Sequence, residues 1–142
     1  FEILAHQMQP VYQETSALRR LFLIGQAYIR FGIENQDWYT LMFNSASPMN
    51  HIERCKSEWG HGIAIFEYLV STCREALAEA ERPGIDERIL ALQMWSTVHG
   101  LVSLSNTQRL TIVDGNCTVG MDCPLIDLTL ENMMFTLFNH KI

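Results

Sequence analysis

The stretch from Asp86 to Gln108 most constrains the fold, because its apolar side chains form two stripes at helical spacing. One stripe holds Ile89, Leu92, Trp95 and Val102, and the other holds Leu90, Met94, Leu101 and Leu104. A helix that is apolar on two sides must be covered twice. We expect the chain's own helices to cover one stripe, and either a further helix or a second copy of the molecule to cover the other.

The rest of the chain predicts further helices and no strands, since alternating patterns, internal repeats and low-complexity segments are all absent from the sequence. Their expected positions are Phe1 to Met8 as the tail of an entering helix, Thr15 or Ser16 to Glu34, Trp38 to Phe43, a helix from about Trp59 that ends at Pro83-Gly84, and a last helix from Pro124. Residues 111–122 are expected to form a loop, although 110–113 can extend the central helix. The sequence therefore predicts an all-α helical bundle.

The last helix resembles the central one because it is apolar on more than one face. Two such helices can pair with the same two helices of a second subunit. We therefore predict a homodimer in which the last two long helices form a four-helix interface. The expected interface residues are Leu90, Met94, Leu101 and Leu104 from the central helix, and Ile126, Leu130, Met133 and Leu137 from the last helix.

Length and composition limit the classes of protein to which the chain can belong. The 142 residues fit one domain, and 48% hydrophobic with 18% charged residues suggests apolar surface used at an interface or a pocket. A net charge of −6 without a basic run disfavours direct nucleic-acid binding. The first residue is Phe, so we expect a fragment or a processed chain. No stretch has the length of a membrane span.

The cysteines bear on the compartment. Cys117 and Cys123 share a polar loop and can form a disulfide, but without a secretory signal we expect free thiols and a cytoplasmic protein.

With these elements in place, the chain resembles the C-terminal ligand-binding and dimerisation domain of the TetR/AcrR family of bacterial transcriptional regulators. The resemblance rests on residues 27–43, on residues 91–104 with the Trp-x-x-x-His-Gly motif of Trp95, His99 and Gly100, and on the terminal amphipathic helix. It covers nearly the whole chain in element order.

The resemblance implies more than the spacing shows. It implies that residues 1–142 are the effector-binding and dimerisation domain of a repressor, and that operator DNA is bound by an N-terminal helix-turn-helix domain absent from this chain. Residues 1–10 would be the end of the connecting helix that transmits ligand occupancy. The motif names no ligand.

A pocket for a small, largely apolar ligand is the first functional hypothesis. Its candidate residues are Tyr28, Phe31, Trp38, Met42, Phe66, Trp95 and His99. Aromatic rings and Met make an adaptable apolar wall, and the Tyr28 hydroxyl, the Trp95 N–H and a His99 nitrogen can orient a ligand. The alternative is that these residues fill an ordinary core, with His99 as a buried imidazole that fixes the packing beside Gly100. The rival function is a helical dimerisation domain without an effector.

A metal protein or an enzyme is a third possibility. His51 and Cys55 stand at i, i+4, and His61, Cys73 and His99 could approach them, but a closed site needs about four ligands and the spacing supplies two. The chain has no GxSxG, no glycine-rich phosphate loop and no HExxH. We therefore expect no catalytic residues, no metal and no cofactor.

Overall fold

The computed structural model describes residues 2–44, 60–118 and 123–139, and all regular secondary structure in these ranges is helical. The elements are α1 (Glu2–Gln7), η1 (Gln9–Gln13), α2 (Ala17–Glu34), α3 (Gln36–Tyr39), the π-helix η2 (Thr40–Asn44), α5 (Gly60–Glu79), α6 (Glu87–Asn106), α7 (Leu110–Val113) and α8 (Pro124–Phe138). The predicted all-α bundle is confirmed.

The long helices begin where their capping residues predict. The Ser16 side chain accepts a hydrogen bond from the Arg19 backbone N–H at the start of α2, and the Asp86 side chain accepts from Arg88 and Ile89 at the start of α6. Pro124 occupies the first turn of α8. The Ser16 and Asp86 side chains satisfy N–H groups that have no partner within the helix, whereas Pro124 has no N–H that would need one.

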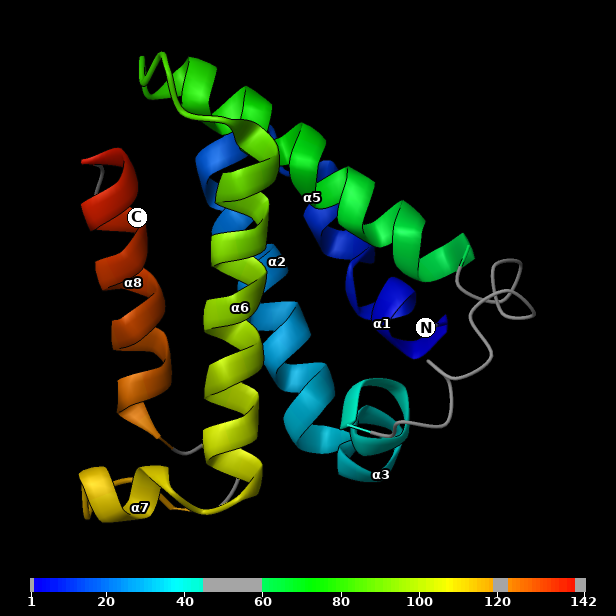
Figure 1. The fold of residues 1–142 in the computed structure, drawn as a ribbon, viewed down its shortest axis with the longest axis vertical. Helices are drawn as coiled ribbons and strands as arrows, with labels where there is room; N and C mark the ends of the chain where they lie inside the picture. Colours follow the sequence, from blue (N-terminus) through cyan, green and yellow to red (C-terminus); the bar gives the residue numbers. More distant parts are fainter. Residues whose placement is uncertain (1, 45–59, 119–122, 140–142) are drawn as a thin grey trace.

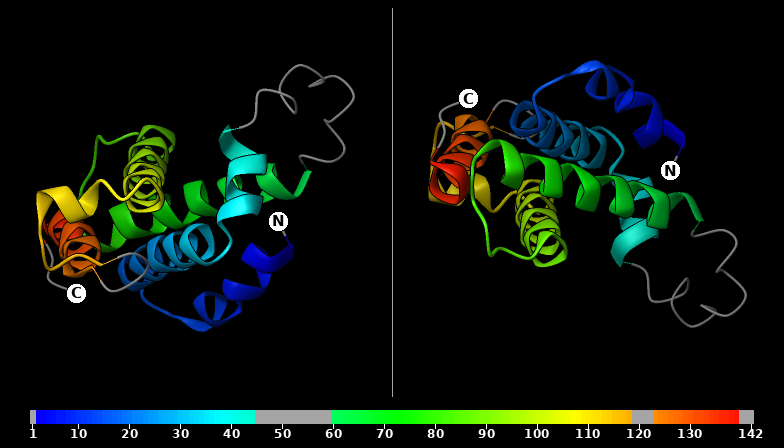
Figure 2. Two further views of the ribbon diagram at one scale, coloured as in Figure 1. Left: turned by 90° about the horizontal axis from the view of Figure 1, so that it is seen from below. Right: turned by 90° about the horizontal axis from the view of Figure 1, so that it is seen from above.

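Helix α2 is the centre of the bundle. It packs against α1, α5, α6 and α8, while α5 also packs against α6. Figures 1 and 2 show α5 crossing the bundle diagonally and α6 and α8 lying next to each other beside α2. A Cβ added at Gly25 would lie 3.3 Å from Leu130 of α8 and 3.5 Å from Val98 of α6, so this glycine marks the point where the three helices meet.

Most of the expected interface residues lie inside the chain's own core, which corrects their assignment. Leu90, Met94 and Leu101 of α6 are buried, as are Ile126 and Leu130 of α8. These five side chains are covered within a single chain and offer no surface to a partner. Of the remaining three, Leu104 is exposed, whereas Met133 and Leu137 are partly buried against the core.

Another set of apolar side chains on the same two helices is exposed. Ile89 and Leu92 of α6 are more than half exposed, and Leu128 and Phe135 of α8 are 56% and 46% exposed. Leu128 and Phe135 are seven residues apart, which places them on one face of α8, two turns from each other. Apart from Gly100, its two neighbours and the backbone of its own helix, no atom of the described residues lies within 4 Å of the position that a Cβ at Gly100 of α6 would take.

Cys117 and Cys123 form a disulfide, which corrects the expectation of free thiols. The bond joins the segment after α7 to the N-cap residue of α8, and both cysteines are buried. Cys73 of α5 keeps a buried free thiol. No helix in the described ranges is long and apolar enough to cross a membrane.

The metal hypothesis finds no support in the part of the chain that the structure describes, where no three His, Cys, Asp or Glu residues come together as ligands. His51 and Cys55 lie outside the described residues, as does Trp59.

Candidate functional site

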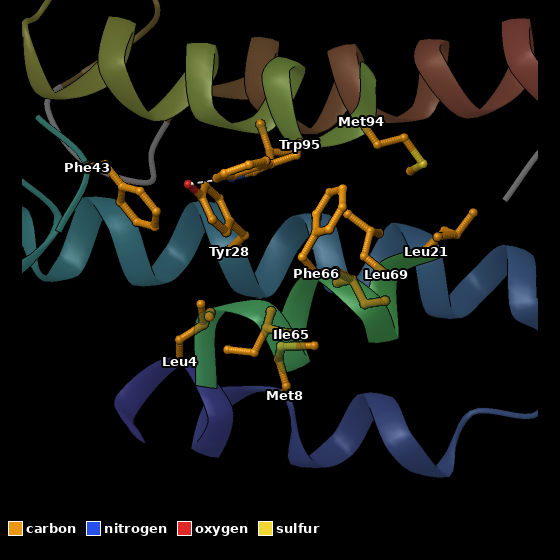
Figure 3. A pocket seen from close by; sticks show the side chains of 14 residues that line it. Leu4, Met8, Leu21, Tyr28, Phe43, Ile65, Phe66, Leu69, Met94 and Trp95 are labelled. Carbon is orange, nitrogen blue, oxygen red and sulfur yellow. Dashed lines mark hydrogen bonds between the residues drawn. The ribbon is translucent and has the colours of Figure 1, made fainter. Parts of the chain in front are cut away.

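A cavity lies between α1, α2, η2, α5 and α6 (Figure 3). It leaves about 80 Å³ open to the centres of water-sized molecules, several times the roughly 10–15 Å³ that one water needs. The wall consists of Leu4 and Met8 at the N-terminal end, Leu21, Ile24, Gly25 and Tyr28 of α2, Phe43 of η2, Gly62, Ile65, Phe66 and Leu69 of α5, and Met94, Trp95 and Val98 of α6.

Helical spacing explains how each element contributes to this wall. On α2, α5 and α6 the lining residues recur three or four positions apart, so that they form one face of each helix. Leu4 and Met8 approach from the N-terminal segment and are almost completely buried. Gly25 adds space, because it has no side chain to occupy the face of α2 between Leu21 and Tyr28. The site is thus a gap where four helices and one helical turn converge.

A cluster of polar side chains adjoins one end of the cavity. The Trp95 indole N–H donates a hydrogen bond to the Tyr28 hydroxyl oxygen at 3.1 Å, drawn in Figure 3. The Tyr28 hydroxyl lies 3.1 Å from Nδ1 of His99, and the Tyr39 hydroxyl lies 2.5 Å from the same nitrogen. The cluster therefore joins α2, α3 and α6 through four side chains.

Burial keeps this cluster uncharged near neutral pH. It lowers the pKa of His99 below its ordinary value, since the imidazolium loses hydration inside the protein. It also raises the pKa values of Tyr28 and Tyr39, which disfavours either phenolate. A neutral His99 whose Nδ1 carries no proton can accept from a phenol. The cluster thus consists of neutral groups that hydrogen-bond one another.

A family model described as "Tetracyclin repressor-like, C-terminal domain" matches residues 21–117. The chain belongs to this family. No curated protein and no solved structure matches it. The matched span of the TetR-like domain includes Tyr28, Trp95 and His99, together with all of α5 and α6 and most of α2.

Three of the predicted pocket residues line the cavity of this TetR-like domain. They are Tyr28, Phe66 and Trp95. His99 lies behind them and contacts Tyr28 and Tyr39, so its position agrees more closely with the packing role than with direct ligand contact.

The other three predicted residues lie away from the wall. Phe31 is buried on α2 but does not line the cavity, Trp38 is 57% exposed, and Met42 is partly buried against the core. The reason is local. The lining of α2 ends at Tyr28, and Phe31 lies almost one turn beyond that end, while the turn at Asn35 redirects the chain so that Trp38 is exposed and Tyr39 is buried.

Sequence reasoning missed most of the apolar wall, including Leu4, Met8, Phe43, Ile65 and Val98. The sequence of α2 did contain a signal for the wall, since Leu21, Ile24 and Tyr28 follow helical spacing around Gly25. No local pattern predicts that Leu4 and Met8 meet α5, since that contact depends on the path of the chain between α1 and α2.

Proposed function

We propose that this chain is the effector-sensing, dimerising domain of a bacterial TetR-type repressor, which binds a small, largely apolar molecule in the cavity. A preceding helix-turn-helix domain would bind the operator. The observation that carries this proposal is the cavity itself, because an apolar space walled by aromatic, aliphatic and Met side chains is typical of small-molecule sites. Since operator DNA is in the bacterial cytoplasm, we infer that the protein acts there.

Helix α1 gives the cavity a direct link to the N-terminal end of the chain. Leu4 and Met8 form part of the wall, so a bound molecule contacts the segment that would lead to the DNA-binding domain. A ligand shifts a conformational equilibrium by its difference in affinity for the two states. A molecule that fits only one position of α1 would therefore change how the DNA-binding domains are spaced.

Dimerisation would use the exposed apolar faces of α6 and α8. Leu92 and Leu104 on α6 and Leu128 and Phe135 on α8 are the apolar side chains that a second copy would cover. The open space beside Gly100 would let a helix of that copy approach closely. We therefore keep the two helices predicted for the homodimer and replace most of the residues predicted on them.

Thermal unfolding with toluene tests the ligand-binding role. Toluene is neutral and apolar, and a ligand at ten times its Kd stabilises the folded state by about 1.4 kcal/mol. For a chain of this size we expect the unfolding temperature to rise by roughly 3–6 °C. Ile65→Trp, which fills the wall of the cavity, should abolish the rise.

Ile63→Trp is the matched control, because Ile63 is on the same helix, two residues earlier, is 53% exposed and does not line the cavity. It should leave the response to toluene intact. If neither toluene nor other small neutral apolar molecules raise the unfolding temperature, the result would instead favour the rival function, a helical dimerisation domain without an effector.

A further inference from the structure

None of the described residues that line the cavity carries a formal charge. Of these fourteen described residues, only Tyr28 and Trp95 have a nitrogen or oxygen in the side chain. A carboxylate or an ammonium group moved from water into such a site loses hydration and gains no ionic partner from this wall. The wall therefore selects against charged ligands.

The two polar side chains of the wall differ in what they can still offer. Trp95 has one donor, its indole N–H, and that donor already bonds to the Tyr28 oxygen. The Tyr28 hydroxyl both donates and accepts, and it contacts the Trp95 N–H and Nδ1 of His99. Among the described residues of the wall, Tyr28 is thus the one side chain that can both donate and accept a hydrogen bond.

The second contact of Tyr28 is shared with Tyr39. Nδ1 of an unprotonated imidazole offers a single lone pair, and the Tyr39 oxygen, at 2.5 Å, is closer to it than the Tyr28 oxygen, at 3.1 Å. Tyr39 also hydrogen-bonds to the Tyr28 hydroxyl itself, so the two phenols and the imidazole form one network. The Tyr28 hydroxyl is thus held in position by three neighbours, as expected of a preorganised ligand anchor. Tyr39 has alternative acceptors, Nδ1 and the backbone oxygen of His99, so a ligand group can take its place on Tyr28.

We propose that the cavity takes an uncharged, mostly apolar molecule with one hydrogen-bonding group, and that this group bonds to the Tyr28 hydroxyl. Tyr28 is then the residue that determines specificity for the polar end of the ligand, while Trp95, His99 and Tyr39 position it. This inference rests on the proposed ligand-binding role and narrows the class of effector to neutral molecules such as alcohols, ketones or esters.

Four one-ring probes test the proposal, each titrated into the purified domain at pH 7.5 by calorimetry: toluene, benzyl alcohol, benzoate and benzylamine. Benzyl alcohol should bind about three- to tenfold more tightly than toluene, as expected for one hydrogen bond. Benzoate and benzylamine, both charged at this pH, should bind at least about tenfold more weakly than benzyl alcohol. Tyr28→Phe should bring the affinities of toluene and benzyl alcohol together.

Tyr12→Phe is the control, because Tyr12 packs against Tyr68 and does not line the cavity. It should keep the preference for benzyl alcohol. Retained toluene binding in Tyr28→Phe verifies that the cavity survives the substitution; if that variant fails to fold, the ranking of the four probes on the wild-type domain decides. Benzoate or benzylamine binding as tightly as benzyl alcohol, or an unchanged preference in Tyr28→Phe, would overturn the proposal. Failure of all four probes to bind would refute the ligand-binding role itself.

Discussion

Gly32 and Gly100 both lie inside long helices, but only Gly32 is crowded. A Cβ at Gly32 would lie 2.5 Å from a methyl carbon of Val102, whereas a Cβ at Gly100 would meet nothing within 4 Å. Gly32→Ala should therefore push α2 and α6 apart and lower the free energy of unfolding by about 1–3 kcal/mol. Gly60→Ala is the control, because Gly60 is exposed at the start of α5, has nothing within 4 Å of its Cβ position and lies outside the proposed dimer interface. It should not destabilise the folded chain. Guanidinium unfolding measures both, and equal effects would contradict the close packing at Gly32.

His99 gives the fold a pH dependence with a definite sign. Its pKa is lowered in the folded state, so the unfolded state binds more protons as the pH falls. The stability that neutral His99 contributes is complete above its ordinary pKa of about 6.5, and is lost on acidification below that value. The loss should stay below about 1.4 kcal/mol per pH unit, the limit for one proton.

The measurement compares unfolding free energies at pH 7.5 and pH 5.5 for the wild type and two variants. His99→Gln should show a smaller decrease on acidification than the wild type. His6→Gln removes an exposed imidazole on α1 and should leave the decrease unchanged. A wild type and a His99→Gln variant with the same pH profile would show that His99 is freely protonated in the folded domain.

At the scale of single residues, the sequence predicted the residue types of the site better than their positions. Trp95 and Tyr28 were found because a helical spacing with polar-tipped aromatics is visible in the sequence. Tyr39 was missed as a partner of His99 because it follows a turn, and a one-residue difference there exchanges the buried position of Tyr39 with the exposed position of Trp38.

At the scale of elements, the disulfide fixes where α8 begins. It closes a short loop between the end of α7 and the N-cap of α8, because the two cysteines have a sequence separation of 6. Closing so short a loop restricts the unfolded chain, and the chain-entropy account assigns about 2 kcal/mol to it. Adding dithiothreitol should lower the unfolding temperature by roughly 3–8 °C.

The double variant Cys117→Ser with Cys123→Ser serves as the control for this effect. Its unfolding temperature should match that of the reduced wild type and should not respond to dithiothreitol, since Cys73, the other cysteine among the described residues, has a free thiol. A reductant effect that persists in the double variant would show that the stabilisation arises elsewhere in the chain.

The starts of the long helices were predictable, because Ser16, Asp86 and Pro124 are local signals. The faces of α6 were not. Its two apolar stripes look alike in sequence, and periodicity does not say which one meets α2 and α5. The structure buries Leu90, Met94 and Leu101 of the stripe assigned to a partner and leaves Leu104 exposed. Of the other stripe it exposes Ile89 and Leu92 but buries Val102, so each stripe is covered only in part.

At the scale of the whole molecule, the homodimer is tested by placing charge on the face of α8. Leu128→Glu combined with Phe135→Glu would put two carboxylates into the proposed interface, where they lose hydration without a partner. We expect native mass spectrometry at micromolar concentration to report a dimer for the wild type and a monomer for the double variant, with unchanged helical circular dichroism.

Ile63→Glu is the control, since its side chain is 53% exposed, close to the 56% of Leu128, and belongs to α5 rather than to α6 or α8. It should remain dimeric. A wild-type domain that is monomeric at this concentration, or a dimer unaffected by both charges on α8, would remove α8 from the interface.

The C-terminal end of α5 is joined to the start of α2 by hydrogen bonds and an ion pair. Near its C-terminus, Glu79 accepts hydrogen bonds from the Ser16 hydroxyl and the Ala17 backbone N–H, and Glu75 pairs with Arg20, so the last turns are joined to the start of α2. The lining residues of α5 belong to its first half. If the cavity binds a ligand as proposed, that ligand would contact α5 in the half that lies away from its attachment to α2.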